Sequence, residues 1–286
     1  MPFGDLLVCL DCLLGWLLMF RLKHIFVLTF VFIFGIACQD TTEPVHNVSS
    51  SQLTVITSGG FAAAYEVLAP VYEKNTGIKL VTLYGSSSGG AHDSIPSRLS
   101  RGEYADIVIL SRPALERLTS ENYIAKDTRV DLVDSTIGMA VLKGSVIPDI
   151  STEEAFVSTL REARSIGYSA SASGTYLSTV LWPRIGVWQE LKPKSKRIIG
   201  ERVATVIARG EVEIGFQQIS EILPNKNVQL VGPIPSDLQK VTTFSAAVLK
   251  KSEYSSAARD LIRYLSSSEV TGHIAATGLT PLALEE

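Results

Sequence analysis

Cysteine is scarce in this chain and absent from most of its length. Only three of the 286 residues are cysteine, and all lie at or before Cys38. We expect the rest of the chain to have no disulfide and to be held by its core alone. Cys9 and Cys12 have a redox-like or zinc-like spacing, but they lie inside an apolar run without partner ligands. The four histidines are scattered, so we expect no protein-ligated metal ion and no cofactor.

Charge of either sign is also limited. Charged residues make up 19% of the chain and the formal net charge is -3. A nucleic-acid binder normally carries a basic face, so we expect no nucleic-acid partner. Hydrophobic residues make up 46%, which is enough for the core of one or two domains and excludes global disorder.

No apolar run after Cys38 approaches the roughly 20 residues that span a bilayer. The main apolar runs lie within residues 6–37. The run from Ile25 to Ala37 suits the apolar segment of a signal peptide, and Arg21 and Lys23 precede it as a basic region should. A membrane hairpin made of both runs is the alternative, and Asp11 in the middle of the first run weighs against it.

Small residues stand just before Cys38. This arrangement resembles a bacterial lipoprotein signal, in which the cysteine is lipidated and becomes the mature N-terminus, although Gly35 stands where a branched apolar residue is typical. We expect residues 1–38 to be a signal segment, with translation starting at Met19 as a further hypothesis. The resemblance implies export to the periplasm or cell envelope, and a lipid anchor in the membrane if Cys38 is lipidated rather than the signal simply cleaved.

Strand and helix signals alternate from residue 52 to the C-terminus. Residues 39–51 are polar and indicate a flexible tether. Leu53–Thr57 is a strand pattern, and a helical pattern follows it and ends at Gly77. Asp106–Leu110 is a short, nearly all-apolar segment of the kind buried in a parallel sheet. Such alternation predicts an α/β protein.

Three loops have the same chemical character. Ser58-Gly59-Gly60, Ser86–Gly90 and Ser171–Thr175 each follow a predicted strand, and we expect each to open a helix. Such loops present unpaired backbone N–H groups and hydroxyls at the positive end of a helix. If they converge, they form a cradle for an anion that contains no lysine or arginine. The alternative is that each serine caps only its own helix.

The order of these features resembles the periplasmic molybdate-binding proteins, which are solute receptors of ABC importers. The strongest stretch is LTVITSGGFAAAYEVLAPVYEKNTGIKLVTLYGSSSGG, followed by GEYADIVILSRP. It contains the strand, serine loop, helix, turn at Lys74–Gly77, second strand, triple-serine loop and Ala105-Asp106-Ile107 strand of that family. The resemblance runs from about Gln52 to the C-terminus.

The resemblance implies five ligand-binding residues. Ser58 and Ser87 would offer hydroxyls, and Ser173 and Gly200 would offer backbone N–H groups. The fifth position holds a tyrosine in the molybdate binders and Gln218 here, which can still donate through its amide. Gln217, on the opposite face of the same strand, is the competing candidate.

The resemblance also implies a type II periplasmic-binding-protein fold. It would have two α/β domains, each a mixed sheet flanked by helices, with residues 52–134 and 244–286 in domain I, 135–243 in domain II and the ligand in the cleft between them. The implied function is that of a monomeric receptor, not an enzyme, which binds a molybdate-like or tungstate-like oxyanion and delivers it to an ABC permease.

Two other functions remain open from the residues. One is a receptor for a small organic acid or phosphonate clamped by arginine, with four candidates: Arg98, Arg101, Arg112 and Arg184. The other is a serine hydrolase built on Gly85-Ser86-Ser87-Ser88-Gly89, which satisfies the G-x-S-x-G pattern. Asp106 or Asp131 and then His273 would complete its triad.

Overall fold

The computed structural model describes residues 52–88 and 90–282. The expected signal segment, the start at Met19, the lipidation site Cys38 and the tether 39–51 lie outside these residues. Within the described ranges, no helix combines the length and the apolarity that a membrane crossing needs.

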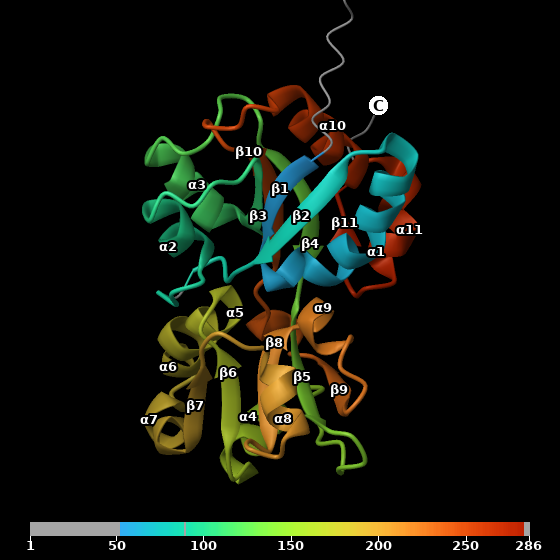
Figure 1. Ribbon diagram of the computed structural model, residues 1–286. Coiled ribbons are helices and arrows are strands. Elements are labelled where there is room, and N and C mark those ends of the chain that lie inside the picture. The colour runs from blue at the N-terminus through green and yellow to red at the C-terminus, as the bar shows by residue number, and fades with distance from the viewer. Residues whose placement is uncertain (1–51, 89, 283–286) are drawn as a thin grey trace, which may run out of the picture. The chain divides into compact units, whose positions relative to one another are not determined.

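The first of two sheets has six strands in the order β11-β4-β10-β3-β1-β2 (Figure 1). β1 pairs in parallel with β2 and β3, whereas β10 is antiparallel to β3 and β4. The sequence predicts that β3 lies in a parallel sheet, whereas β3 is parallel to β1 and antiparallel to β10. The bounds are β1 (Gln52–Thr57), β2 (Lys79–Tyr84), β3 (Ile107–Ser111), β4 (Val130–Ser135), β10 (Thr242–Val248) and β11 (Thr280–Pro281).

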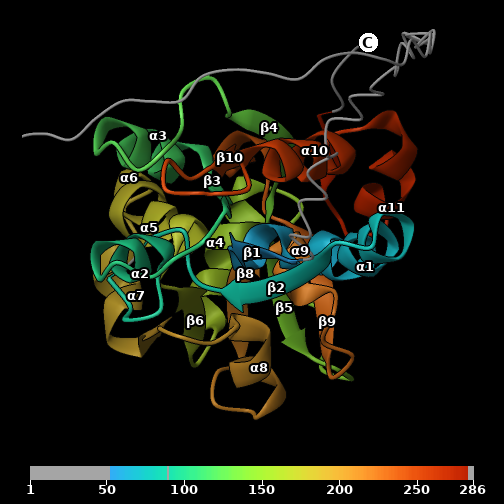
Figure 2. The ribbon, with the colours of Figure 1, turned by 45° about the horizontal axis from the view of Figure 1, so that its top comes forward.

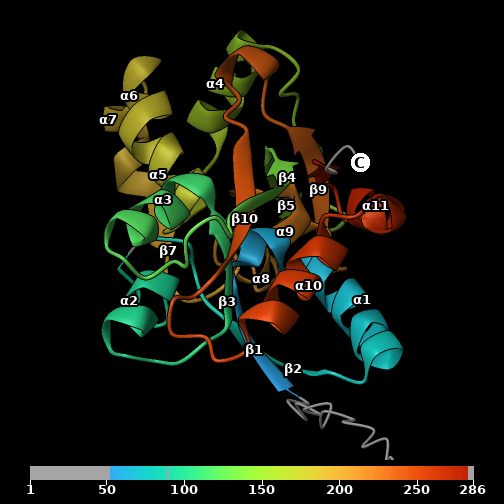
Figure 3. The same cartoon turned by 90° about the horizontal axis from the view of Figure 1, so that it is seen from above.

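Helices cover both faces of this sheet (Figure 3). Along β1, Val55 belongs to one buried cluster and Ile56 to another, because successive side chains of a strand point to opposite faces. The first cluster contains α1 (Gly59–Thr76), α10 (Ser255–Leu265) and α11 (Thr271–Ala275), and the second contains α2 (Ile95–Ser100) and α3 (Arg112–Ser120).

The second sheet has five strands in the order β7-β6-β8-β5-β9. β6 is parallel to β7 and β8, and β5 is antiparallel to β8 and β9. The bounds are β5 (Ile137–Leu142), β6 (Ile166–Ser169), β7 (Ser195–Ile198), β8 (Ile214–Gln218) and β9 (Val228–Pro233).

Helices also cover both faces of the second sheet, and the turned view of Figure 2 shows α8 and α4 with the strands between them. One cluster contains α4 (Glu153–Glu162), α5 (Ala172–Tyr176), α6 (Trp182–Arg184) and α7 (Trp188–Leu191), and the other contains α8 (Val203–Ala208) and α9 (Ile219–Ile222). The prediction of an α/β fold with two mixed, helix-flanked sheets is confirmed.

The chain passes between the two sheets twice, after β4 and before β10 (Figure 1). The Gln239 amide fastens the second crossing to the first: its Oε1 accepts from Ile137 N at 2.9 Å and its Nε2 donates to Ile137 O at 2.9 Å. The predicted domain boundaries fall inside β4, before its last residue, and inside β10, and the division itself stays a prediction.

One prediction about local structure is wrong. The triple-serine loop does not open a helix, because α2 begins only at Ile95. Its first residues fold back on themselves instead, with Ser86 Oγ donating to Ser88 O at 2.7 Å. The helix begins where Ser94 accepts from Ser97 N and Pro96 occupies the first turn, the combination that favours a helix start.

Candidate functional site

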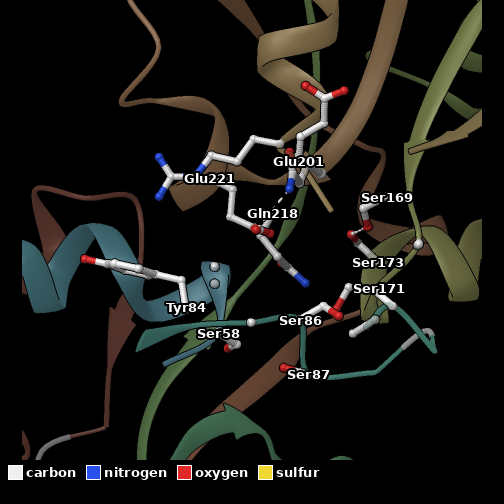
Figure 4. A pocket seen from close by; sticks show the side chains of 18 of the residues that line it. Ser58, Tyr84, Ser86, Ser87, Ser169, Ser171, Ser173, Glu201, Gln218 and Glu221 are labelled. Atoms are coloured by element: carbon white, nitrogen blue, oxygen red, sulfur yellow. Dashed lines mark hydrogen bonds between the residues drawn. The ribbon is translucent and has the colours of Figure 1, made fainter. Parts of the chain in front are cut away.

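The loops at the ends of both sheets surround one cavity of about 280 Å³ (Figure 4). Its lining includes residues that follow β1, β2, β6 and β7 and the end of β8. All five residues expected from the sequence line it: Ser58, Ser87, Ser173, Gly200 and Gln218. The structure therefore brings these residues together, while their contact with a ligand stays a prediction.

Ser58 lies at the junction of β1 and α1. Its backbone N donates to Ile109 O at 2.7 Å, which fixes the residue to the sheet. Its side chain does not cap α1 and is only 2% exposed, and no described residue forms a hydrogen bond with its Oγ. Leaving a buried hydroxyl unpaired costs about 1–3 kcal/mol, so this group is suited to bind a ligand in the cavity.

The other serines of the lining differ in their hydrogen bonds. Ser87 Oγ accepts from Ser111 N at 2.9 Å, so its own hydrogen remains for another acceptor. Ser173 Oγ lies 3.0 Å from Ser169 Oγ. Ser171 precedes α5 without a side-chain capping bond. The alternative that Ser58 and Ser171 serve as side-chain caps for their own helices is therefore wrong.

Both candidate glutamines line the cavity, because β8 ends at Gln218 and the chain turns there into α9. Gln218 Oε1 accepts from Ser135 Oγ at 2.9 Å, and its Nε2 donates to Thr242 Oγ1 at 3.2 Å. Gln217 Oε1 accepts from Val203 N at 2.7 Å. Gln218 thus joins the two crossings of the chain, and its amide nitrogen retains a second hydrogen.

A carboxyl group that the sequence analysis did not single out also faces this space. Glu221, on α9, is half-buried, and its Oε1 accepts from Gln217 Nε2 at 3.0 Å. Burial raises the pKa of Glu221 to about 7, against the opposing effects of Arg202 and of hydrogen bonds from Gln217 and Gln218. The carboxylate lies against the first residue of α1, where a side chain on Gly59 would collide with Oε1.

Arg202 is the only lysine or arginine among the described residues that line the cavity. Its guanidinium is 3.8 Å from the carboxylate of Glu66, which lies on α1. Glu201 also lines the cavity, but it forms an ion pair with Arg209 at 2.7 Å and points away from the serines (Figure 4). No local sequence signal marks Arg202 or Glu221, because their position depends on contacts with α1.

The arginines expected as a clamp lie elsewhere. None of the four lines the cavity. Arg98 and Arg101 pair with Glu103, and Arg112 pairs with Glu116 and Asp131. Arg184 is exposed at the end of α6. The charge partner available to an anion is Arg202 instead.

The hydrolase triad is not assembled. Asp106 accepts from Thr54 N, Tyr104 and Ser252, and lies outside the cavity lining, as do Asp131 and His273. His273 is exposed on α11. The serine-hydrolase interpretation is therefore wrong. Across residues 52–88 and 90–282, no three His, Cys, Asp or Glu side chains are grouped to hold a metal ion.

Comparisons with known proteins find relatives with two different names. An aconitate isomerase of Pseudomonas sp. is 44% identical over 230 residues, which cover 80% of this chain and 88% of the relative. The molybdate-binding protein ModA of Escherichia coli (strain K12) is 24% identical over 205 residues, or 70% of this chain and 77% of the relative.

The fold is also similar to that of solved structures of periplasmic binding proteins. The periplasmic molybdate-binding protein of Azotobacter vinelandii superimposes with a TM-score of 0.66 at 18% identity, over 82% of this chain and 100% of that chain. Residues 53–280 match the family described as bacterial extracellular solute-binding protein. The chain therefore belongs to this family of solute-binding proteins, and its fold is that of the ModA-type periplasmic binding proteins.

Proposed function

We propose that this protein binds a small polycarboxylate of the aconitate type in the cavity and interconverts its geometric isomers. The observation that carries the proposal is a carboxyl group, Glu221, that lines the same cavity as the serine hydroxyls and the guanidinium of Arg202. The similarity to a relative named aconitate isomerase, at 44% identity, gives the substrate class.

The size and charge of the cavity favour a carboxylate over molybdate. About 280 Å³ is close to the roughly 300 Å³ at which sites for small organic molecules begin, and a tetrahedral oxyanion has only four oxygens around one atom. Gln218 stands where the molybdate binders have tyrosine, so the space is not closed by a ring. Arg202 adds a cation that could pair with a carboxylate in bidentate geometry.

Interconversion of cis and trans isomers requires a carbon–carbon double bond to lose its double-bond character for a moment. Reversible addition of a thiol is one route, but residues 39–286 contain no cysteine. The other route is proton transfer next to a carboxylate, which moves the double bond along an allylic unit. A carboxyl whose pKa is raised to about 7 is suited to this route, because a general base works best when its pKa is near the operating pH.

The second candidate is a receptor that delivers a small oxyanion to an ABC permease, without chemistry. Membership in a solute-binding family favours it, as does the Ser58 hydroxyl, which has no hydrogen-bond partner among residues 52–88 and 90–282. Closure of the two sheets around the ligand would then be the signal that the permease recognises. In both cases we propose an exported, monomeric protein, with Cys38 as the point of lipid attachment.

The two candidates are separated by one experiment on the wild-type protein. Calorimetric titration with trans-aconitate, cis-aconitate, citrate, molybdate, tungstate and sulfate measures binding, and proton NMR of the aconitate solutions measures interconversion. We expect binding and interconversion of aconitate. Tight binding of molybdate without any change in aconitate would contradict the enzymatic proposal and support the receptor.

A further inference from the structure

We infer that Glu221 is the catalytic residue that moves the proton in this isomerisation, and that Gly59 keeps its carboxylate in place. The inference rests on the proposed function and identifies the group that performs it. Glu221 comes from α9 and Gly59 from the start of α1, so the two sides of the cavity meet at this contact.

The carboxylate of Glu221 is held rather than free. Gln217 Nε2 donates to Oε1 at 3.0 Å, and Gln217 itself is fixed by the bond from Val203 N at 2.7 Å. The neighbouring Ser220 Oγ donates to Gly60 O at 2.8 Å, which ties α9 to the first turn of α1. The absence of a side chain at Gly59 leaves the room in which the carboxylate lies.

The other carboxyl groups in the lining are less suited to this role. Glu201 is bound to Arg209 and points away from the serines. Glu66 is exposed and lies beside Arg202. Asp93 lies on the loop after β2 and remains the competing base, so it is included in the test.

One carboxylate is sufficient for the reaction, because the group that removes the proton also returns one. Glu221 takes a proton from the methylene carbon between a carboxylate and the double bond, and the electron pair spreads over the allylic unit and its carboxylate. The same proton, or one exchanged with water, returns to the former vinylic carbon. The double bond then lies between the other two carbons with the opposite geometry, and Glu221 is ionised again.

The surroundings would stabilise the charge that develops. Arg202 and the hydroxyl of Ser58 line the same cavity, and the first-turn N–H groups of α1 present the positive end of an 18-residue helix. The same groups would bind the substrate carboxylates, so substrate recognition and proton transfer take place in the same cavity.

The test compares Glu221→Gln with Asp93→Asn and with the matched control Glu201→Gln, which removes a carboxylate from the same lining. Each variant is measured by NMR for the rate of trans-aconitate conversion, in water and in deuterium oxide, and by calorimetry for aconitate binding. We expect Glu221→Gln to lose about a hundredfold or more in kcat and to incorporate no deuterium, while its Kd changes only a few-fold. Glu201→Gln should keep the wild-type rate.

Two further variants separate a catalytic from a structural role. Glu221→Asp keeps a carboxylate and should retain more activity than Glu221→Gln. Gly59→Ala should lower kcat more than it raises KM, because the methyl group displaces the carboxylate while thermal unfolding stays cooperative. An Asp93→Asn variant that is inactive while Glu221→Gln is active overturns the inference and leaves the proposed function intact. A wild-type protein that converts no aconitate overturns both.

Discussion

The two sides of the cavity differ in the kind of groups they supply. The six-stranded side contributes neutral donors after β1 and β2, chiefly Ser58 and Ser87. It contributes no lysine or arginine to the described lining, and its charged groups there are the carboxyls of Glu66 and Asp93. The five-stranded side contributes Arg202, Gln217 and Glu221 as well as the serines of β6 and α5. The stretch that most resembles the molybdate binders lies on the first side, and the substitution at Gln218 lies on the second.

This difference distinguishes the anion-binding groups that proteins of this fold can share from the groups that can change between them. Hydroxyls and helix N-termini bind any oxyanion, whether it is a metal oxyanion or a carboxylate. Selectivity and chemistry require groups placed on the opposite side, where a charge partner and a proton carrier can be introduced without disturbing the anion cradle. A binding fold can therefore acquire an activity by changes on one side of its cleft.

The comparison of the two sides predicts the largest change in ligand binding for removal of Arg202, the cation of the five-stranded side. We expect Arg202→Ala to weaken aconitate binding about ten- to a hundredfold, since a charged hydrogen bond is worth roughly 1.5–3 kcal/mol. Wild-type affinity should fall with added salt and that of the variant should not. Calorimetry at two ionic strengths measures both. Arg209→Ala, which removes a nearby exposed arginine paired with Glu201, should bind normally; weak binding by it would point to a general charge effect.

The ionisation of Glu221 gives a prediction about stability. Its pKa is raised from 4.5 to about 7 in the folded protein, so between these values the folded state binds more protons than the unfolded state. Stability is therefore lost as pH rises from about 4.5 to 7, and the loss is complete above that range. Glu221→Gln should be more stable than wild type at pH 8 by about 1–3 kcal/mol, and the two should converge near pH 4.5. Equal differences in thermal midpoint at both pH values would contradict this.

Much of the first side could be predicted from sequence, because local patterns determine it. The alternation of strands and helices and the Ser-Gly composition of the loop at Ser58 are visible along the chain. Arg202 and Glu221 could not be found in this way. Glu221 reaches the cavity because α9 packs against α1, an element far away in sequence, and no motif surrounds it. Arg202, which precedes α8, is placed by its contact with Glu66 of α1. Strand alternation also placed Gln217 and Gln218 on opposite faces, whereas the turn into α9 brings both to the cavity.

Loss of a neutral donor should have a smaller effect than loss of the arginine. Ser58→Ala removes a hydroxyl that has no partner within the described protein, so we expect about a tenfold loss of affinity without a loss of stability. Ser94→Ala is the matched control, because Ser94 caps α2 by accepting from Ser97 N. That variant should lose about 1 kcal/mol of stability and bind normally. Calorimetry and thermal unfolding together distinguish the two; a destabilised Ser58→Ala with unchanged affinity would show that Ser58 is structural.

The smallest effect concerns the ion pair between the two sides. Arg202 and Glu66 are 3.8 Å apart and both are partly exposed, so their pairing contributes only about 0–1 kcal/mol. A bound carboxylate competes with Glu66 for the guanidinium. Glu66→Gln should therefore strengthen aconitate binding two- to fivefold at low salt, because it removes both a competitor and a negative charge near the ligand. The gain should vanish in the background of Arg202→Ala if it acts through the arginine. A gain that persists in the double variant would show that Glu66 repels the ligand directly and does not act through the arginine.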